Sequence, residues 1–339
     1  MPPAQTPGSS LAGSGQGPGP ASSRLLHTAF ARYAWAVLAY NLAVVLWGAF
    51  VRATGSGAGC GNHWPLCNGE VTPHSPGMAT IIEFTHRATS GLDLALVAAL
   101  VIWAFRAFPR AHRVRRAATL SAVFLATEAL IGAALVLLEH VARNASVSRV
   151  YSLSTHLVNT LTLLACLTLT AWWAVERPKL PGPRAGVLPR RRAAWMAAAS
   201  LTAVAILGVS GAIAALGDTL FPSSSLAAGL AQDFDPAANL FVRLRSLHPI
   251  IAVAAGLWLA FFAASAAPRP GARVPAQTTA ALLGAQILAG VANLWLLAPV
   301  WMQLLHLLLA DLLWISLVLL SDSILATARQ TSKLPGTAT

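Results

Sequence analysis

Charged residues are scarce in this 339-residue chain: Asp, Glu, Lys and Arg make up 10% of it, whereas water-soluble domains carry about 25%. Hydrophobic residues make up 56%, and the mean hydropathy is +0.64. This composition excludes a water-soluble enzyme. It also excludes a disordered or fibrous protein, because the apolar residues arrive in long blocks.

Acidic residues are the scarcer of the charged types, with 11 Asp and Glu against 23 Lys and Arg, for a net charge of +12. In a soluble protein such an excess would suggest nucleic-acid binding. Here the basic residues lie mostly in short segments between apolar runs, which is typical of membrane topology. We therefore expect membrane lipid, and no nucleic acid, as a partner.

Cysteine is also rare, and three cysteines cannot form a disulfide framework. Cys60 and Cys67 enclose six residues of a Gly-rich segment and could form a bridge on an oxidising side of the membrane. Two interpretations of this pair stay open: a structural cross-link, or a redox pair that accepts or passes electrons. Cys166 lies within an apolar stretch and is expected to pack in the core.

What the chain does contain is eight apolar stretches, each near the roughly 20 residues that cross a bilayer. The sequence therefore predicts an all-α polytopic membrane protein with eight transmembrane helices. The expected spans are 33–52, 84–105, 117–138, 151–175, 193–216, 246–267, 278–298 and 300–321.

The distribution of Lys and Arg predicts the orientation of these spans. Basic residues gather in the segments 106–116, 176–192 and 268–276, which the positive-inside rule places in the cytoplasm with both termini. The long loops 53–82 and 217–245 then face outside. A composition rich in Arg, Ala and Gly, without a transit-like leader, favours a bacterial plasma membrane.

The two halves of the chain repeat one another at low identity. Thr127-Glu128-Ala-Leu-Ile-Gly132 parallels Ala285-Gln286-Ile-Leu-Ala-Gly290. Each repeat holds four spans, so both cross the membrane in the same sense, as parallel repeats do. We expect two four-helix bundles. The predicted organisation is a disordered tail at 1–29, an N-terminal half at 30–176, a cytoplasmic basic linker at 177–192, a C-terminal half at 193–322 and a tail at 323–339.

Four of the nine histidines, His86, His156, His248 and His306, lie at the start of the second, fourth, sixth and eighth spans. They are expected in the first turn or two of their helices, all near the outer face. A single membrane histidine is as often an interhelical hydrogen-bonding residue as a ligand. Two per repeat at one depth instead predict two axial pairs for haem iron. Zinc would need Cys or carboxylate ligands that do not cluster here.

Glu83 lies three residues before His86 and shares its helical face. It is either a carboxylate that moves protons or steadies a developing cation, or an outer-surface residue near a helix N-terminus. The arginines near the outer face are either contacts for haem propionates or interfacial anchors; they are Arg52, Arg87, Arg243 and Arg245. Three acidic residues within spans, Asp93, Glu128 and Asp311, fit a proton path and buried hydrogen bonding equally well.

These residues together resemble the haem A synthase family. The resemblance rests on Val51-Arg52-Ala-Thr-Gly-Ser-Gly, the spacing of Cys60 and Cys67 with Trp-Pro-Leu before Cys67, and Glu83-x-x-His86-Arg87. It extends over roughly residues 30–325. The family oxidises the C8 methyl group of haem O to a formyl group, which gives haem A for cytochrome oxidase.

The resemblance implies a role for each of these residues. His86 and His156 would ligate the substrate haem O, and His248 and His306 would ligate a haem b cofactor that carries electrons. Glu83 would be the catalytic residue. The pair Cys60 and Cys67 would take part in haem transfer or electron passage. A haem O synthase would supply the substrate, cytochrome oxidase assembly would consume the product, and a homo-oligomer is left open.

One feature departs from the family's pattern. Many relatives carry a second cysteine pair in the outer loop of the C-terminal half, whereas 217–245 contains none. Any thiol chemistry would therefore rest on the first pair alone. Two other classes remain: a cytochrome b-type electron carrier with two bis-histidine haems, and a transporter built from parallel repeats.

Overall fold

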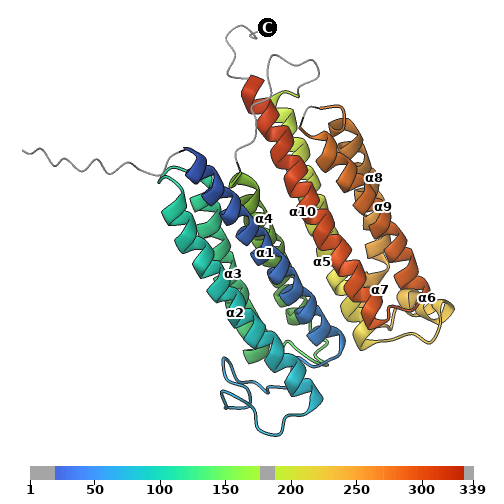
Figure 1. The fold of residues 1–339 in the computed structure, drawn as a ribbon. Coiled ribbons are helices and arrows are strands. Elements are labelled where there is room, and N and C mark those ends of the chain that lie inside the picture. The colour runs from blue at the N-terminus through green and yellow to red at the C-terminus, as the bar shows by residue number, and fades with distance from the viewer. Residues whose placement is uncertain (1–19, 176–187, 270, 332–339) are drawn as a thin grey trace, which may run out of the picture.

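The protein is described by a computed structural model that covers residues 20–175, 188–269 and 271–331 (Figure 1). Within these ranges the structure consists of ten helices and their connecting loops. They are α1 (Pro20–Ala53), α2 (Met78–Ala107), α3 (Arg113–Leu137), α4 (Val147–Trp173), α5 (Arg190–Leu220), α6 (Leu226–Phe234), α7 (Leu240–Arg245), α8 (Leu247–Ala266), α9 (Arg273–Trp295) and α10 (Val300–Thr331).

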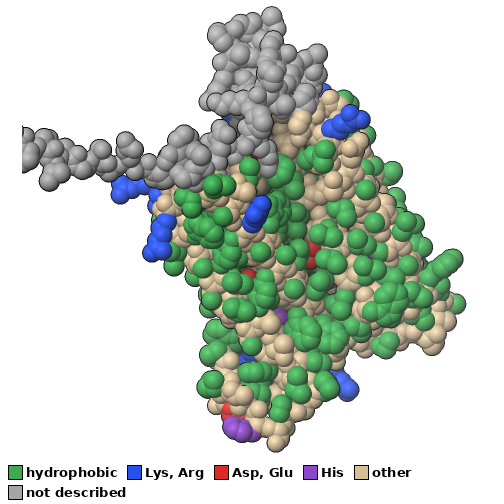
Figure 2. All heavy atoms as spheres, in the orientation of Figure 1, with side chains coloured by type: hydrophobic (Ala, Val, Ile, Leu, Met, Phe, Trp, Pro, Cys, Tyr) green, Lys and Arg blue, Asp and Glu red, His purple; other side chains and the backbone are tan. Residues whose placement is uncertain are grey.

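Eight segments are long and apolar enough to cross a membrane, with α7 and α8 forming one of them, Leu240–Ala266. Helices are suited to this role because every backbone N–H and C=O is satisfied within the segment. Large apolar side chains such as Leu257, Leu288 and Trp295 remain exposed on the outside of the bundle. Hydrophobic side chains cover much of the visible face, with basic residues toward its two ends (Figure 2). The prediction of an all-α polytopic membrane protein is confirmed.

The helices form two four-helix bundles that lie side by side (Figure 1). In the N-terminal half, α1 packs on α2 and α4, and α3 packs on both α2 and α4. In the C-terminal half, α5 and α9 pack on both α8 and α10 in the corresponding arrangement. The described ends of the chain lie at the same end of the molecule, and the loop that contains Cys60 and Cys67 lies at the other. This second end is called the cysteine-loop end below.

The two halves meet through α1, α4, α5 and α10. The indole of Trp314 donates a 2.7 Å hydrogen bond to the Leu161 carbonyl across the interface. At the C-terminal end of α4, the indoles of Trp172 and Trp173 donate to the carboxylate of Asp322 in α10, at 3.0 and 3.1 Å. A polar group inside a membrane is costly unless it finds a partner, so these contacts fix how the halves sit together.

Several helices are longer than their apolar cores. Helix α1 begins at Pro20, so the expected disordered tail at 1–29 is wrong for residues 20–29; residues 1–19 lie outside the described part. The helix hydrogen-bond ladder continues beyond the apolar run through a mixed segment that includes Ala and Leu, which have good helix propensity. Hydropathy therefore located the part of the helix that spans the membrane but not its end.

The predicted extents of the linker and the C-terminal tail are corrected in the same way, because α5 and α10 are also longer than their apolar segments. The expected linker 177–192 overlaps α5, which already begins at Arg190; residues 176–187 lie outside the described part. The expected tail at 323–339 is helical through Thr331, because α10 continues past its apolar core. Residues 332–339 are likewise outside the described ranges.

Candidate functional site

The four histidines lie toward the cysteine-loop end, on helices that all run in the same direction. Because α2 and α4 begin earlier than expected, His86 and His156 lie in the third turns of their helices rather than in the first or second. His248 and His306 lie in the first and second turns of α8 and α10. The predicted position within the first or second turn was therefore wrong by about one turn for the N-terminal pair, and the predicted common depth in the membrane stays a prediction.

Two histidine rings lie directly against a glycine of the preceding span. A Cβ atom on Gly48 of α1 would lie 2.9 Å from Cε1 of His86, closer than real Cβ contacts allow. In the C-terminal half, a Cβ on Gly211 of α5 would lie 2.9 Å from Cε1 of His248. Glycine at these two positions therefore provides the space for each imidazole between its helices.

The other two histidines show the same arrangement with more room. A Cβ on Gly132 would lie 4.0 Å from Cε1 of His156, and a Cβ on Gly290 would lie 3.2 Å from Cε1 of His306. Both glycines belong to the segments that the sequence repeat aligns. The repeat thus preserves, in each half, two imidazole rings that are each set beside a glycine.

The two histidines of each half lie on helices that pack on the same two neighbours. His86 on α2 and His156 on α4 lie between α1 and α3, and His248 on α8 and His306 on α10 lie between α5 and α9. Nδ1 of His86, His156 and His306 is buried and forms no hydrogen bond. Nδ1 of His248 instead lies 3.0 Å from the Ser210 hydroxyl. Each of the four rings thus keeps one nitrogen that no described protein group occupies, in space lined by glycine, which fits axial ligation of a haem iron.

A bare metal ion would need a different donor set. Across the described ranges no three His, Cys, Asp or Glu side chains converge on one point. A haem brings four nitrogens of its own and needs two axial ligands, so one histidine pair per half fits it. Both halves therefore offer residues that fit a haem.

Glu83 is buried, with 3% of its surface exposed, in the second turn of α2. Its Oε1 lies 2.6 Å from Nη2 of Arg87, and its Oε2 accepts the backbone N–H of Cys60 at 2.9 Å. The helix N-cap is Gly77. The interpretation of Glu83 as an outer-surface residue at a helix N-terminus is therefore wrong, because the loop folds over this turn and removes the carboxylate from solvent.

The covering loop is closed by a disulfide between Cys60 and Cys67. Arg87 Nη1 donates to the carbonyls of His63 and Leu66 inside this ring, each at 2.7 Å. The loop also touches α2 closely at Gly59, where a Cβ would lie 2.4 Å from the backbone of α2. The disulfide ring, Arg87 and Glu83 thus form one connected unit beside the His86 turn.

Glu70, in the exposed part of the same loop, lies 3.0 Å from Nδ1 of His74. Its side-chain hydrogen bond with His74 lowers the pKa of Glu70 below its usual value. The pair is open to solvent, and the Glu70 carboxylate is bonded to His74 rather than to Glu83 or Arg87.

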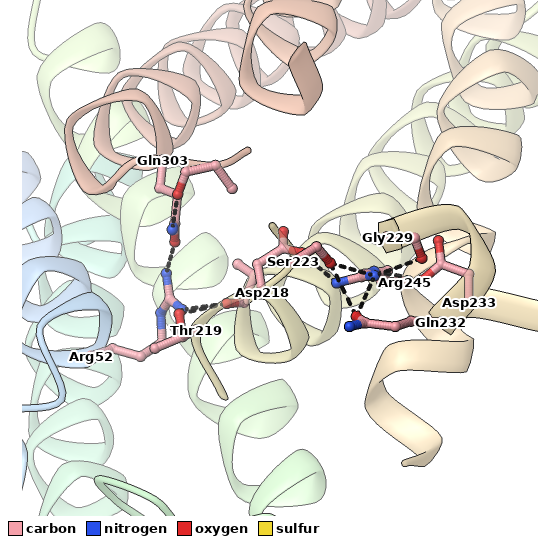
Figure 3. Close-up of polar contacts among 11 residues, drawn as sticks. Arg52, Asp218, Thr219, Ser223, Gly229, Gln232, Asp233, Arg245 and Gln303 are labelled. Atoms are coloured by element: carbon pink, nitrogen blue, oxygen red, sulfur yellow. Dashed lines mark hydrogen bonds and ion pairs between the residues drawn. The ribbon is translucent and has the colours of Figure 1, made fainter. Parts of the chain in front are cut away.

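Arg52 and Arg245 are both held by protein acceptors (Figure 3). Arg52 lies at the interface of the two halves, whereas Arg245 and its partners lie within the C-terminal half. Arg52 donates to the Ala215 carbonyl at 3.0 Å, to the Thr219 hydroxyl at 3.2 Å and to Gln303 Oε1 at 3.0 Å. Since Arg52 belongs to α1 and its partners to α5 and α10, it joins the two halves.

Arg245 forms ion pairs with Asp218 at 3.1 Å and with Asp233 of α6 at 2.6 Å. Arg87 is engaged by Glu83 and the loop, and Arg243 is exposed. Three of the four arginines expected near haem propionates therefore have protein partners in this structure. Their contact with propionates stays a prediction.

The halves share their glycine and histidine framework but differ in the charge placed around it. Glu83 precedes His86 by three residues, and Arg245 precedes His248 by three. Buried Asp93, which receives a 2.5 Å hydrogen bond from Asn41, follows His86 by seven residues, where the C-terminal half has Ala255. On α2 carboxylates therefore precede and follow His86 at positions where the C-terminal half has Arg245 and Ala255 around His248.

Glu128 extends the same contrast. It lies 3.5 Å from Nδ1 of His156, whereas its repeat counterpart Gln286 lies 3.2 Å from Nε2 of His306. Asp311 of α10 is buried with one carboxylate oxygen unpaired, and it belongs to neither histidine contact. The residues that hold Glu128 were not singled out from the sequence, although the aligned repeats differ at those positions.

Fold and site together define a duplicated multi-pass membrane protein with one haem-compatible histidine pair in each half. Residues 31–318 match the family described as cytochrome oxidase assembly protein, COX15-CtaA. The chain belongs to this family.

Individual relatives carry two different names. The chain is 50% identical over 312 residues to a protein of Thermus thermophilus named "Protoheme IX farnesyltransferase", covering 90% of this chain and 49% of the relative. It is 50% identical over 95 residues to "Heme A synthase" of Bacillus mycoides, covering 28% and 30% of the two chains. The chain spans about half the length of the Thermus relatives it matches.

Proposed function

We propose that the protein is a haem A synthase that oxidises the C8 methyl group of haem O to a formyl group. The observation that carries this proposal is the unequal charge of the two repeats: buried Glu83 stands beside His86, and Arg245 occupies the same position before His248. Two equal electron-carrying haem sites would not require this difference. The membership in a cytochrome oxidase assembly family and the partial match to named haem A synthases support the proposal.

The N-terminal half is proposed to hold the substrate haem O through His86 and His156. Conversion of a methyl to a formyl group takes up the oxygen of one water molecule and releases protons and electrons. The electrons would leave one at a time through the haem b of the other half to an external acceptor, and the protons need an acceptor near the porphyrin edge. Glu83 meets this need because Arg87 and the Cys60 N–H fix its carboxylate on the face of α2 that carries His86. A fixed negative charge would also stabilise positive charge that develops at the methyl carbon.

The C-terminal half is proposed to hold haem b through His248 and His306. A haem b bound there supplies reversible one-electron chemistry. Ser210 orients the His248 ring through Nδ1, and Gln286 contacts His306 without adding a charge. Arg52 keeps this half in register with the N-terminal half by its contacts to α5 and α10.

The membrane setting and partners complete the proposal. We propose that both termini lie in the cytoplasm of a bacterial plasma membrane and the Cys60–Cys67 loop outside, a proposal that the basic segments support through the positive-inside rule. Haem O would come from a haem O synthase, and haem A would pass on to cytochrome oxidase assembly. A protohaem farnesyltransferase as the supplying partner accords with the name that the Thermus relatives carry.

That name also makes farnesyl transfer a second candidate function for this chain. Prenyl transfer from a diphosphate uses Mg²⁺ held by clustered carboxylates. The 11 acidic residues of this sequence are scattered, with no two adjacent. The Thermus relatives are about twice as long as the matched region, so their name describes a larger protein. Haem oxidation therefore accounts for this chain's residues better.

The deciding experiment is chromatography of haems extracted from the purified protein after co-expression with a haem O synthase. We expect haem B together with haem O or haem A. Haem B alone would favour the electron carrier, and haem O formed from protohaem and farnesyl diphosphate by this chain alone would favour the transferase. In a second arm, His248→Ala should remove haem B while the other haem remains, and retention of full haem B would exclude the assigned C-terminal site.

A further inference from the structure

Glu128 of α3 is held against α4 by contacts on both of its carboxylate oxygens. Asn159 donates to Oε2 at 2.5 Å, and the Thr160 hydroxyl is hydrogen-bonded to Oε1. Thr127 in turn donates to Asn159 Oδ1 at 2.7 Å. These contacts leave Oε1 at 3.5 Å from Nδ1 of His156. Since His156, Asn159 and Thr160 are three and four residues apart, one face of α4 receives the whole carboxylate.

The C-terminal repeat lacks the carboxylate of this cluster and the three polar side chains that support it. Counted from His306 as from His156, the positions of Asn159 and Thr160 hold Leu309 and Ala310. The positions of Thr127 and Glu128 hold Ala285 and Gln286. Only the amide contact between Gln286 and His306 remains, at 3.2 Å, and the other amide atom of Gln286, Oε1, is buried without a partner. The carboxylate and its support are thus specific to the N-terminal half.

We propose that Glu128 is a positioning residue that orients His156 and lowers the reduction potential of the haem held in the N-terminal half. A carboxylate beside the distal nitrogen of a ligating imidazole fixes the ring and makes it a stronger donor to iron. The added negative charge stabilises the ferric state over the ferrous state. Gln286 brings no charge to His306, and it contacts Nε2 rather than Nδ1 of that ring. The C-terminal haem therefore lacks a carboxylate at the distal nitrogen and keeps the higher potential.

A lower reduction potential in the N-terminal half suits the proposed roles of the two halves, and the inference rests on that proposed function. Electrons released by oxidation at the N-terminal half would move toward the haem of higher potential in the C-terminal half. Glu128 thereby acts on the direction of electron flow without contacting the methyl group. Glu83, which lies on α2 beside Arg87, keeps the proton-accepting role.

The test uses the full-length protein in detergent, co-expressed with a haem O synthase, and two mirrored variants. Glu128→Gln gives the N-terminal half the side chain of the C-terminal half, and Gln286→Glu makes the reverse change. Redox titration followed by optical spectroscopy gives the midpoint potential of each haem, and electron paramagnetic resonance gives the g values of each ferric haem. Neither readout requires turnover.

Glu128→Gln should raise the midpoint of the N-terminal haem and change its g values, with the C-terminal haem unmoved. Gln286→Glu should lower the midpoint of the C-terminal haem alone. An unshifted N-terminal midpoint in Glu128→Gln, with that haem retained, overturns the proposal and leaves the proposed function standing. If Glu128→Gln loses the haem, Asn159→Leu is the second variant. It keeps the negative charge of Glu128 but removes the hydrogen bond that holds Oε2 in place. Unchanged g values in Asn159→Leu overturn the proposal.

Failure of the proposed function has a different signature. A wild-type protein that holds no haem on His86 and His156 excludes both the function and this role of Glu128. A wild-type protein that holds two haems, with a midpoint that follows the charge at residue 128, supports both.

Discussion

The carboxylate of Glu83 and the guanidinium of Arg87 lie 2.6 Å apart, one turn apart on α2, with 4% and 13% of their side chains exposed. A buried carboxylate is costly without a compensating charge, and Arg87 provides that charge. The same arginine donates hydrogen bonds to two carbonyls inside the disulfide ring. The fold of the loop and the charge state of the site are therefore coupled through one side chain.

Removing the charge of Glu83 while keeping its shape should separate catalysis from haem binding. Glu83→Gln can still accept the Cys60 N–H, so the loop should stay closed and both haems should remain bound. Without the carboxylate as proton acceptor, the yield of haem A should fall about 100-fold. The measurement is chromatography of extracted haems.

Glu70→Gln is the matched control, because Glu70 lies in the same loop but is exposed. It should leave the haem A yield at the wild-type level. A normal haem A yield in Glu83→Gln would remove Glu83 from the chemistry and reduce its ion pair to a structural contact.

The glycines beside the histidines provide a test that changes no ligand. Gly48→Ala places a Cβ 2.9 Å from the His86 ring, so the ring must shift and the N-terminal haem should be lost. Gly211→Ala should remove the C-terminal haem in the same way, through His248. Haem content per protein, measured by the pyridine haemochrome spectrum, checks both.

Gly91→Ala is the control for this pair. Gly91 lies on α2 with open space where a Cβ would stand, so both haems should remain. Retention of both haems in Gly48→Ala and Gly211→Ala would mean that neither ring occupies its observed position when haem is bound.

Much of this arrangement was predictable from the sequence. The apolar runs predicted eight spans, because hydropathy is a local property of the chain. The placement of His86, His156, His248 and His306 at the starts of alternate spans predicted two histidines per half, because the repeat is visible in the sequence itself. The burial of Glu83 was not predictable, since it depends on a loop some 20 residues away that folds back onto α2. Helix ends were also missed, because apolar length reports bilayer thickness rather than helix length.

The support of Glu128 shows a second limit. Asn159 and Thr160 look like ordinary polar residues of a span until α3 and α4 are placed together. Comparison of the two repeats could have revealed them, because Leu309 and Ala310 stand in their places. Differences within a repeat, more than its shared residues, indicate where the halves differ in function.

The disulfide is expected to matter through the position of Glu83. In Cys60→Ser with Cys67→Ser the loop is no longer closed, and both the Cys60 N–H and the carbonyls that hold Arg87 lose their fixed positions. We expect the haem A yield to fall by more than the amount of folded protein. Size-exclusion chromatography and haem b content report folding.

Cys166→Ser, in the middle of α4, is the control for thiol loss and should keep the wild-type haem A yield. Equal losses of folded protein and haem A yield in the double variant would favour a purely structural cross-link.

Arg52 provides a test of whether it binds haem propionates or joins the two halves. Arg52→Met removes three hydrogen bonds to α5 and α10, and each hydrogen bond to a charged group contributes about 1.5–3 kcal/mol. We expect a lower midpoint of thermal unfolding in detergent, with unchanged haem content and optical spectra in each half. Exposed Arg243→Met should leave the thermal midpoint unchanged. A loss of haem from one half of Arg52→Met, without a change in the thermal midpoint, would instead assign Arg52 to a propionate.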